Sequence, residues 1–165
     1  MSSVTTPSDN RWRGIDVKAA LLAGVIAGIV DWLLSVAIYL LQGQGLWGAA
    51  RMNASLLMGR DVIVEPATFD VTIVLVSIIV HFGLSLIYGL IIAWFVRNSD
   101  WTTGLIIGAA AGFVIYIFNF YLVAPLLYPW MIDMRGLVST LIHPVFGVTA
   151  AAAYIWLRRR TRNRM

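Results

Sequence analysis

Four polar side chains interrupt long apolar segments of this sequence and are the residues best placed to do chemistry: Asp31, His81, Asn119 and His143. Imidazole gains and loses a proton near neutral pH, so two histidines and a carboxylate could relay protons or pass a cation. Two histidines at equal depth could also ligate haem b axially, and Asp31 could join them as the third ligand to a metal. The structural alternative is hydrogen bonding across helices, at about 0.6 kcal/mol per interaction.

The segments around these residues are long and apolar enough to cross a membrane. Residues 71–96 contain no Lys, Arg, Asp or Glu, and a helix of that length rises about 39 Å, against a hydrocarbon core of about 30 Å. Of the 165 residues, 60% are hydrophobic and 12% charged, which is more apolar surface than a soluble domain buries. The sequence predicts an all-α, polytopic membrane protein with a single membrane domain and four transmembrane helices, at 19–42, 71–96, 101–124 and 136–157.

Basic residues predict the orientation of these helices. The terminal segments 1–18 and 158–165 and the turn at Arg97 lie on one side of the four spans and hold nine Lys and Arg, against three on the other side. The positive-inside rule therefore places both termini in the cytoplasm, and we expect the bacterial inner membrane. Because the basic residues flank the spans, they indicate topology and some attraction to lipid, and nucleic acid is not expected as a partner.

Depth along the helices places the four polar side chains in one layer. At a rise of 1.5 Å per residue, Asp31, His81 and His143 lie about 20 Å from the cytoplasmic ends, and Asn119 about 25 Å. Such groups are costly against lipid, so we predict that they converge in the centre of the bundle. The cytoplasmic halves of the spans hold mostly Gly, Ala, Val, Leu and Ile, which argues against a polar path through the whole protein.

Small residues recur at every fourth position beside this layer, a spacing that lets helix backbones approach closely. A shift of 84 residues superposes Gly24 on Gly108 and Gly28 on Gly112, and both histidines are followed by Trp at +13 and by Arg at +16. We therefore predict two tandem helical hairpins, related by a pseudo-two-fold axis along the membrane normal. The predicted helix-packing residues are Gly24, Gly28, Gly104, Gly108, Gly112 and Gly147.

The longest connection, between the first two spans, contains one more predicted helix. Residues 46–58 place Gly48, Arg51 and Ser55 on a narrow polar stripe. We interpret it as an interfacial helix that lies along the membrane surface in the periplasmic loop. The alternative is a helix that caps the bundle through contacts with protein.

Motifs for soluble-type catalysis are missing from the sequence. It has no Gly-x-Ser-x-Gly, no His-Glu-x-x-His, no phosphate loop and no cysteine. We therefore expect no enzyme. The prediction is a structural or accessory subunit that is surrounded by lipid and packs against a larger membrane complex or a second copy of itself.

The last two spans resemble the YagU-like bacterial inner-membrane proteins over residues 101–160. The shared pattern is a glycine-rich helix, a Pro and aromatic turn at 125–130, a helix with His and Gly, and a closing arginine run. The chain is also similar to small proteobacterial membrane proteins with Gly-Gln-Gly-x-Trp, here at 43–47, and His-x-x-Leu-Ser, here at 81–85. Some of those carry automatic sodium:solute symporter names, which four helices with one Asp do not support. The resemblance implies a four-helix inner-membrane fold and brings no catalytic residue with it.

Overall fold

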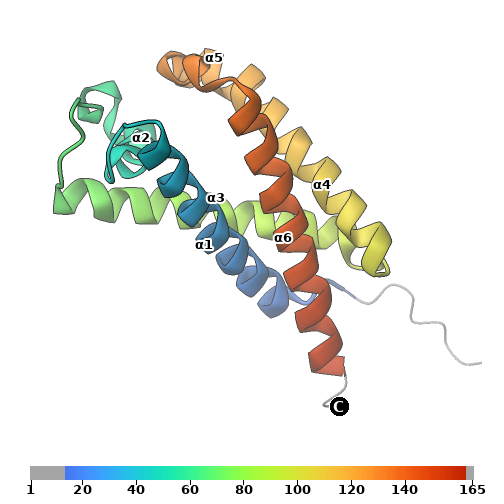
Figure 1. Ribbon diagram of the computed structural model, residues 1–165. Coiled ribbons are helices and arrows are strands. Elements are labelled where there is room, and N and C mark those ends of the chain that lie inside the picture. Colours follow the sequence, from blue (N-terminus) through green and yellow to red (C-terminus); the bar gives the residue numbers. More distant parts are fainter. Residues whose placement is uncertain (1–13, 163–165) are drawn as a thin grey trace, which may run out of the picture.

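The structure, a computed structural model, describes residues 14–162 (Figure 1). This part of the chain is helical without strands, and four of its helices are long and apolar enough to cross a membrane. The predicted all-α fold is confirmed. Most of the predicted N-terminal tail and the last three residues lie outside the described part. The four long helices are α1 (Val17–Leu41), α3 (Val71–Val96), the stretch Trp101–Leu127 and α6 (Leu137–Arg162).

Aspartate side chains start three of the four long helices. Asp16 accepts a hydrogen bond from the Ala19 amide at 3.0 Å. Asp70 accepts from the Ile73 amide at the start of α3, and Asp100 from the Thr103 amide at the start of α4 (Trp101–Ile117), each also at 3.0 Å. An aspartate at this position satisfies an amide that has no partner within the helix. The caps explain why α3 and α4 begin where the sequence predicts, and why α1 begins at Val17, two residues before the prediction.

The third span is longer than predicted and changes its winding before it ends. It consists of α4 (Trp101–Ile117), a π-helical segment η2 (Phe118–Val123) and the short α5 (Ala124–Leu127). Asn119 lies within η2. π-helical turns widen a helix locally and occur frequently at functional sites. The span therefore changes its geometry at the level of the polar layer.

Close glycine contacts hold each hairpin together. A Cβ added to Gly24 would lie 2.7 Å from the carbonyl oxygen of Ser85, and one added to Gly108 would lie 2.5 Å from that of Gly147. These two contacts are equivalent in the predicted repeat, which superposes Gly24 on Gly108 and the histidine-bearing helices α3 and α6 on each other. The tandem hairpins α1–α3 and α4–α6 are therefore confirmed in the register that the sequence predicts.

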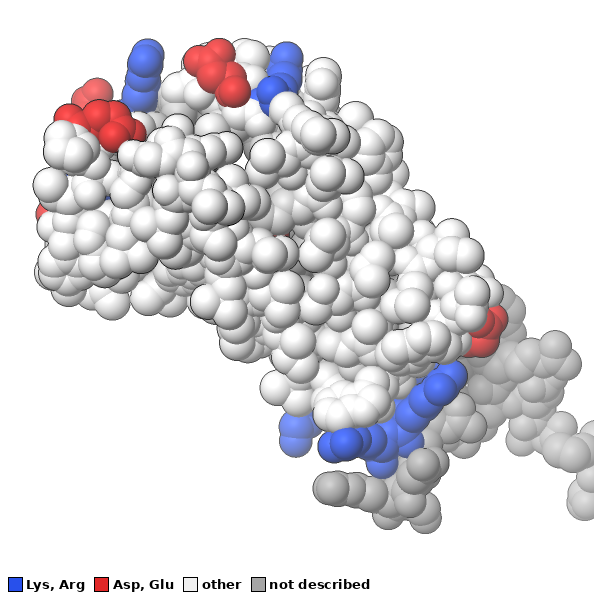
Figure 2. Space-filling model, viewed as in Figure 1, with Lys and Arg blue, Asp and Glu red and all other residues white. Residues whose placement is uncertain are grey.

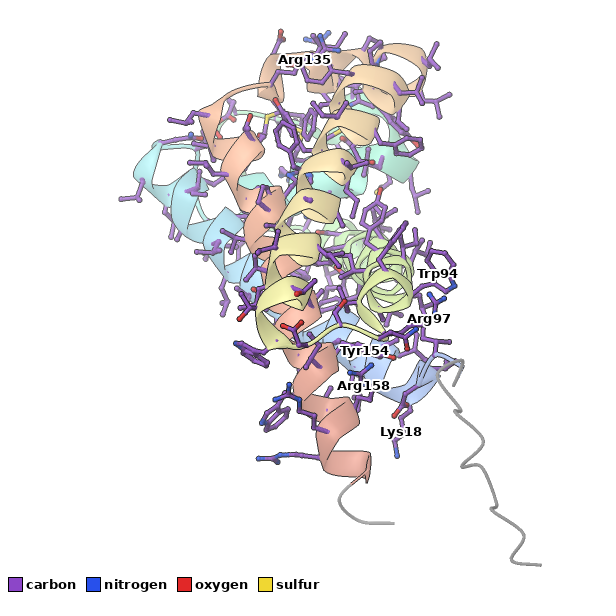
Figure 3. The ribbon with its side chains drawn as sticks, turned by 90° about the vertical axis from the view of Figure 1, so that its right-hand side faces the viewer. Lys18, Trp94, Arg97, Arg135, Tyr154 and Arg158 are labelled. Carbon is purple, nitrogen blue, oxygen red and sulfur yellow. The ribbon has the colours of Figure 1, made fainter. Side chains whose placement is uncertain are left out.

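The two hairpins meet through α6, which packs against both α4 and α1. Helix α3 passes behind α1 and α6 in Figure 1 and is seen end-on in Figure 3, so it crosses them obliquely. The remaining elements are α2 (Gly48–Met58) and two short 3-10 helices, η1 (Arg60–Val62) and η3 (Pro129–Met134).

Helix α2 buries the polar stripe that the sequence predicts. Gly48, Arg51 and Ser55 face protein, whereas Leu57 and Met58 are exposed. The Arg51 guanidinium donates hydrogen bonds of 2.8–3.0 Å to Val62 and Thr68, in the connection to α3. Of the two predictions for this helix, the contacts support capping of the bundle.

Charged side chains gather at two ends of the molecule, and the surface between them is almost free of charge (Figure 2). We call the end with the start of α1, the α3–α4 turn and the end of α6 the inner end, and the opposite end the outer end. Among side chains that the structure describes, the inner end carries Lys18, Arg97, Arg158, Arg159 and Arg160 with Asp16 and Asp100. The outer end carries Arg51, Arg60 and Arg135 with Asp61, Glu65, Asp70 and Asp133.

Candidate functional site: a cavity between the hairpins

A cavity of about 1140 Å³ opens between the two hairpins in the outer half of the molecule. Its walls come from the outer halves of α1 and α6, the middle of α3, the π-helical segment η2 and one side of α2. All four residues of the predicted polar layer line this cavity: Asp31, His81, Asn119 and His143.

The cavity is polar at its mouth and closed by apolar residues on its inner side. Gln42, Gln44, Asp133 and Arg135 line the outer part. Toward the inner end, the described interior is a mainly apolar cluster that includes Ala23, Ala27, Ile92, Ala150 and Ile155, together with the larger Phe146 and Tyr154. The polar part of the lining therefore lies toward the outer end, and the described core on the inner side of the cavity is mainly apolar.

His81 connects α3 to α1. Its Nε2 lies 2.8 Å from the carbonyl oxygen of Gly28. A carbonyl oxygen can only accept, so Nε2 carries the proton and donates, and Nδ1 of the neutral ring keeps its lone pair. The ring also contacts Trp32 edge-on at a centroid distance of 5.2 Å. Only 8% of His81 is exposed, so this histidine is a fixed part of the α1–α3 contact.

His143, its counterpart in the repeat, uses the other ring nitrogen. Its Nδ1 lies 2.8 Å from the carbonyl oxygen of Ser139, one turn earlier in the same helix. The ring is packed between Tyr116 and Phe120, with centroid distances of 5.7 Å and 5.6 Å. Nδ1 therefore donates, and Nε2 keeps the lone pair. The two histidines line one cavity in opposite tautomers.

Asn119 forms the direct polar contact between the hairpins at this level. The hydroxyl of Tyr88 donates to Oδ1 of Asn119 at 2.7 Å and connects α3 to η2. Sequence reasoning missed Tyr88, although it follows His81 by seven residues and so shares its helix face. That spacing was the signal that could have found it.

Arg135 is a second residue that sequence reasoning missed, at the mouth of the cavity. Its Nε donates to the carbonyl oxygen of Phe120 at 2.8 Å, and its guanidinium lies 4.4 Å from the ring centre of Tyr121. The bonded carbonyl belongs to the π-helical segment, where the regular helical hydrogen-bond pattern is interrupted. Arg135 therefore supports the irregular wall of the cavity, a role with no signal in the sequence.

Asp31 differs from the other three residues because none of the described residues pairs with it. It is half-buried and lines the cavity, and its carboxylate makes no hydrogen bond or ion pair with any residue between 14 and 162. No hydrogen bond joins any two of the four layer residues either. The four residues of the polar layer thus line one cavity but do not form a hydrogen-bond network with each other.

The geometry does not suit the metal and haem alternatives. No group of three His, Cys, Asp or Glu side chains in the described chain is arranged to hold a metal ion, so Asp31 does not join the two histidines as a third ligand. For haem, Nε2 of His143 keeps its lone pair, but Nε2 of His81 is bonded to Gly28. The two rings are therefore not a matched pair of axial ligands.

Taken together, the polar atoms left over in the layer are mainly acceptors: two carboxylate oxygens and two ring nitrogens. They stand in a space that is otherwise lined mostly by apolar side chains such as Ile38, Ile87 and Val123.

Comparison with protein-family models, with curated proteins and with solved structures finds no match to this chain. The resemblance to the YagU-like proteins therefore stays a prediction.

Proposed function

We propose that this protein is a non-enzymatic integral membrane protein that binds an amphipathic ligand in the cavity between its hairpins. The observation that carries the proposal is the unpaired carboxylate of Asp31 on the wall of a large, mostly apolar cavity. An ionised group without a partner in such surroundings is costly, and a ligand that pairs with it recovers part of that cost.

The chemistry of the lining indicates the ligand class. Apolar walls accept a hydrocarbon body, and the acceptors of the polar layer require a group that donates hydrogen bonds. A protonated amine supplies both the donors and the opposite charge to Asp31. The proposed ligand is therefore a long-chain amine or a molecule that combines the same two features.

The same proposal includes an orientation. The inner end carries five basic and two acidic described side chains, and the outer end three basic and four acidic. This asymmetry supports cytoplasmic termini in a bacterial inner membrane. The polar outer part of the cavity then faces the periplasm, and the proposal is that a ligand enters from that side.

A proton or cation pathway through the protein has less support. It would require polar groups between the layer and the inner end, where the described core holds apolar residues such as Ala27 and Ile92. Asp31, His81 and His143 all lie on the outer side of that core. Such an arrangement suits binding from the outer side better than passage.

An accessory role in a larger complex stays a prediction. The glycine stripes supported it in the sequence because they offered close contact surfaces. In the structure Gly24, Gly28, Gly108, Gly112 and Gly147 meet helices of the same chain, so these stripes are used internally. Native purification tests this role: co-purifying protein supports it, and a solitary monomer counts against it.

Native mass spectrometry of the detergent-purified protein tests the binding proposal. The probes are dodecylamine, dodecanol and dodecanoate, which share one chain and differ in the polar group. We expect one dodecylamine per protein, and Asp31→Asn should weaken it about tenfold, which corresponds to about 1.4 kcal/mol. Asp61→Asn, an exposed acid outside the cavity, is the matched control. Equal binding of the three probes, or an unchanged amine affinity in Asp31→Asn, would contradict the proposal.

A further inference from the structure

The inner end brings three separate parts of the chain together. The Asp16 amide donates to the Tyr154 hydroxyl at 3.3 Å, which ties the start of α1 to α6. Arg158 Nη2 donates to the carbonyl oxygen of Ser99 at 3.4 Å, which ties the α3–α4 turn to α6. Lys18 and Arg97 each lie two residues from one of these contacts. Figure 3 shows Lys18, Arg97 and Arg158 on the same side of the inner end.

The acidic residues at this end do not neutralise the three cations. Asp16 accepts from the Ala19 amide, and Asp100 accepts from both the amide and the hydroxyl of Thr103. The hydrogen bonds from Thr103 lower the pKa of Asp100. Both aspartates are thus held in place as helix caps. Within residues 14–162 none of the inner-end cations forms an ion pair. The cluster therefore keeps a surplus of positive charge.

Packing holds Arg158 in place, and most of its donors have no acceptor among the described residues. The guanidinium carbon lies 5.7 Å from the ring centre of Tyr154, Nη2 makes the one long bond to Ser99, and Nε is buried without a partner. A guanidinium has five N–H donors in a fixed plane, a geometry that matches phosphate oxygens. Its position is thus fixed by packing, and its hydrogen-bonding capacity is largely unused.

Arg97 is oriented by the end of α3. Its guanidinium lies 4.4 Å from the ring centre of Trp94, and its Nη1 donates to the Trp94 carbonyl oxygen. Trp94 is about half exposed and lies beside Arg97 at the inner end of α3 (Figure 3). Exposed tryptophans at the ends of membrane-spanning helices lie at the level of lipid headgroups.

We propose that Lys18, Arg97 and Arg158 form a binding site for the phosphate of an anionic phospholipid headgroup. The site takes one cation from each of three elements that meet at the inner end, where the headgroups of the inner leaflet would lie. Anionic lipids are abundant in that leaflet, and arginine pairs with phosphate through two parallel hydrogen bonds. This site is separate from the cavity and does not depend on the ligand proposed there.

A general attraction of basic residues to membranes predicts something different, because it depends on charge alone. Arg159 and Arg160 carry the same charge on neighbouring positions of α6. Arg160 lies exposed over the ring of Trp156, at 3.7 Å from its centre, and Arg159 is exposed as well. If charge alone decided lipid binding, removal of Arg159 or of Arg160 would weaken lipid binding as much as removal of Arg158.

The test uses the full-length protein, stripped of lipid in detergent and titrated with phosphatidylglycerol, phosphatidylcholine or inorganic phosphate, with bound lipid counted by native mass spectrometry. We expect one tightly held phosphatidylglycerol, and about tenfold weaker binding in Arg158→Gln and in Arg97→Gln. Arg159→Gln should stay within about twofold of the parent protein. Circular dichroism checks that each variant is folded. If Arg158→Gln does not fold, Arg97→Gln still tests the site.

Three results would overturn the site. Equal retention of phosphatidylcholine would show that the headgroup charge is not recognised. An equal loss in Arg159→Gln would show diffuse attraction instead of a site. Displacement of the lipid by inorganic phosphate at equal concentration would show that the cluster binds free phosphate and not a membrane lipid.

Discussion

The imidazole of His81 donates a hydrogen bond across 2.8 Å to the carbonyl oxygen of Gly28, in the middle of the contact between α3 and α1. Gly28 permits this approach because a Cβ at its position would meet the Ser85 side chain at 2.7 Å. The bond therefore depends on both residue types: an imidazole that reaches across and a glycine that lets the helices touch.

We predict that His81→Phe destabilises the protein more than His143→Phe. His81 bonds to another helix, whereas His143 bonds to Ser139 of its own helix. The difference should be about 0.6–1.7 kcal/mol, the range of hydrogen bonds between membrane helices. Unfolding in mixed micelles with increasing SDS measures it. Equal losses in the two variants would mean that the contact between α1 and α3 does not rely on this bond.

Glycines at the helix contacts should not tolerate an added methyl group. Gly83, which lies away from these contacts, should tolerate one. A Cβ on Gly147 would overlap the carbonyl oxygen of Gly108, but a Cβ on Gly83 has nothing within 4 Å. We expect Gly147→Ala to lower the midpoint of SDS unfolding. Gly83→Ala should keep or raise it, because alanine favours a helix over glycine by about 1 kcal/mol. A similar effect of both substitutions would contradict the close packing of α4 against α6.

Much of the fold was predictable because the sequence encodes it locally. Apolar length gives the number of spans and two of their starts, at 71 and 101. The start of α1 was placed two residues late, because the capping role of Asp16 was not used. The histidine and glycine repeat gave the pairing of helices, since small residues at every fourth position have to face a neighbour. Each of these signals is contained within a single helix or a pair of adjacent helices.

The arrangement of the site was less predictable for physical reasons. Counting residues gives the depth of Asp31 and His81 but not how far each side chain lies from the other helices, which depends on the oblique course of α3. The π-helical turn at Asn119 has no sequence signal that we can name. The predicted layer therefore lies at one level around a cavity. Three of its four residues bond to other groups, Asp31 bonds to none of the described residues, and no two of the four bond to each other.

Tyr88 and Asn119 should be energetically coupled, because their 2.7 Å hydrogen bond joins the two hairpins. In a double-mutant cycle with Tyr88→Phe and Asn119→Leu, we expect a coupling energy of about 0.6 kcal/mol. Unfolding in SDS supplies the four free energies. Tyr88 with Ser139 serves as the control pair, since these residues share the cavity but no hydrogen bond. Additive effects of the first pair would mean that the bond does not hold the hairpins together.

The cap of α4 should make stability depend on pH in the acid range. Hydrogen bonds from Thr103 lower the pKa of Asp100 below its usual 3.8 in the folded protein. A carboxyl whose folded pKa is lowered stabilises the fold fully above its unfolded value, and this contribution disappears as the pH falls through the folded value. Asp100→Asn keeps a capping side chain but cannot titrate. Between pH 5 and pH 2, about the range of this titration, the melting temperature of the parent protein should therefore fall further than that of the variant. Parallel curves for the two proteins would show that the Asp100–Thr103 hydrogen bonds contribute nothing to stability.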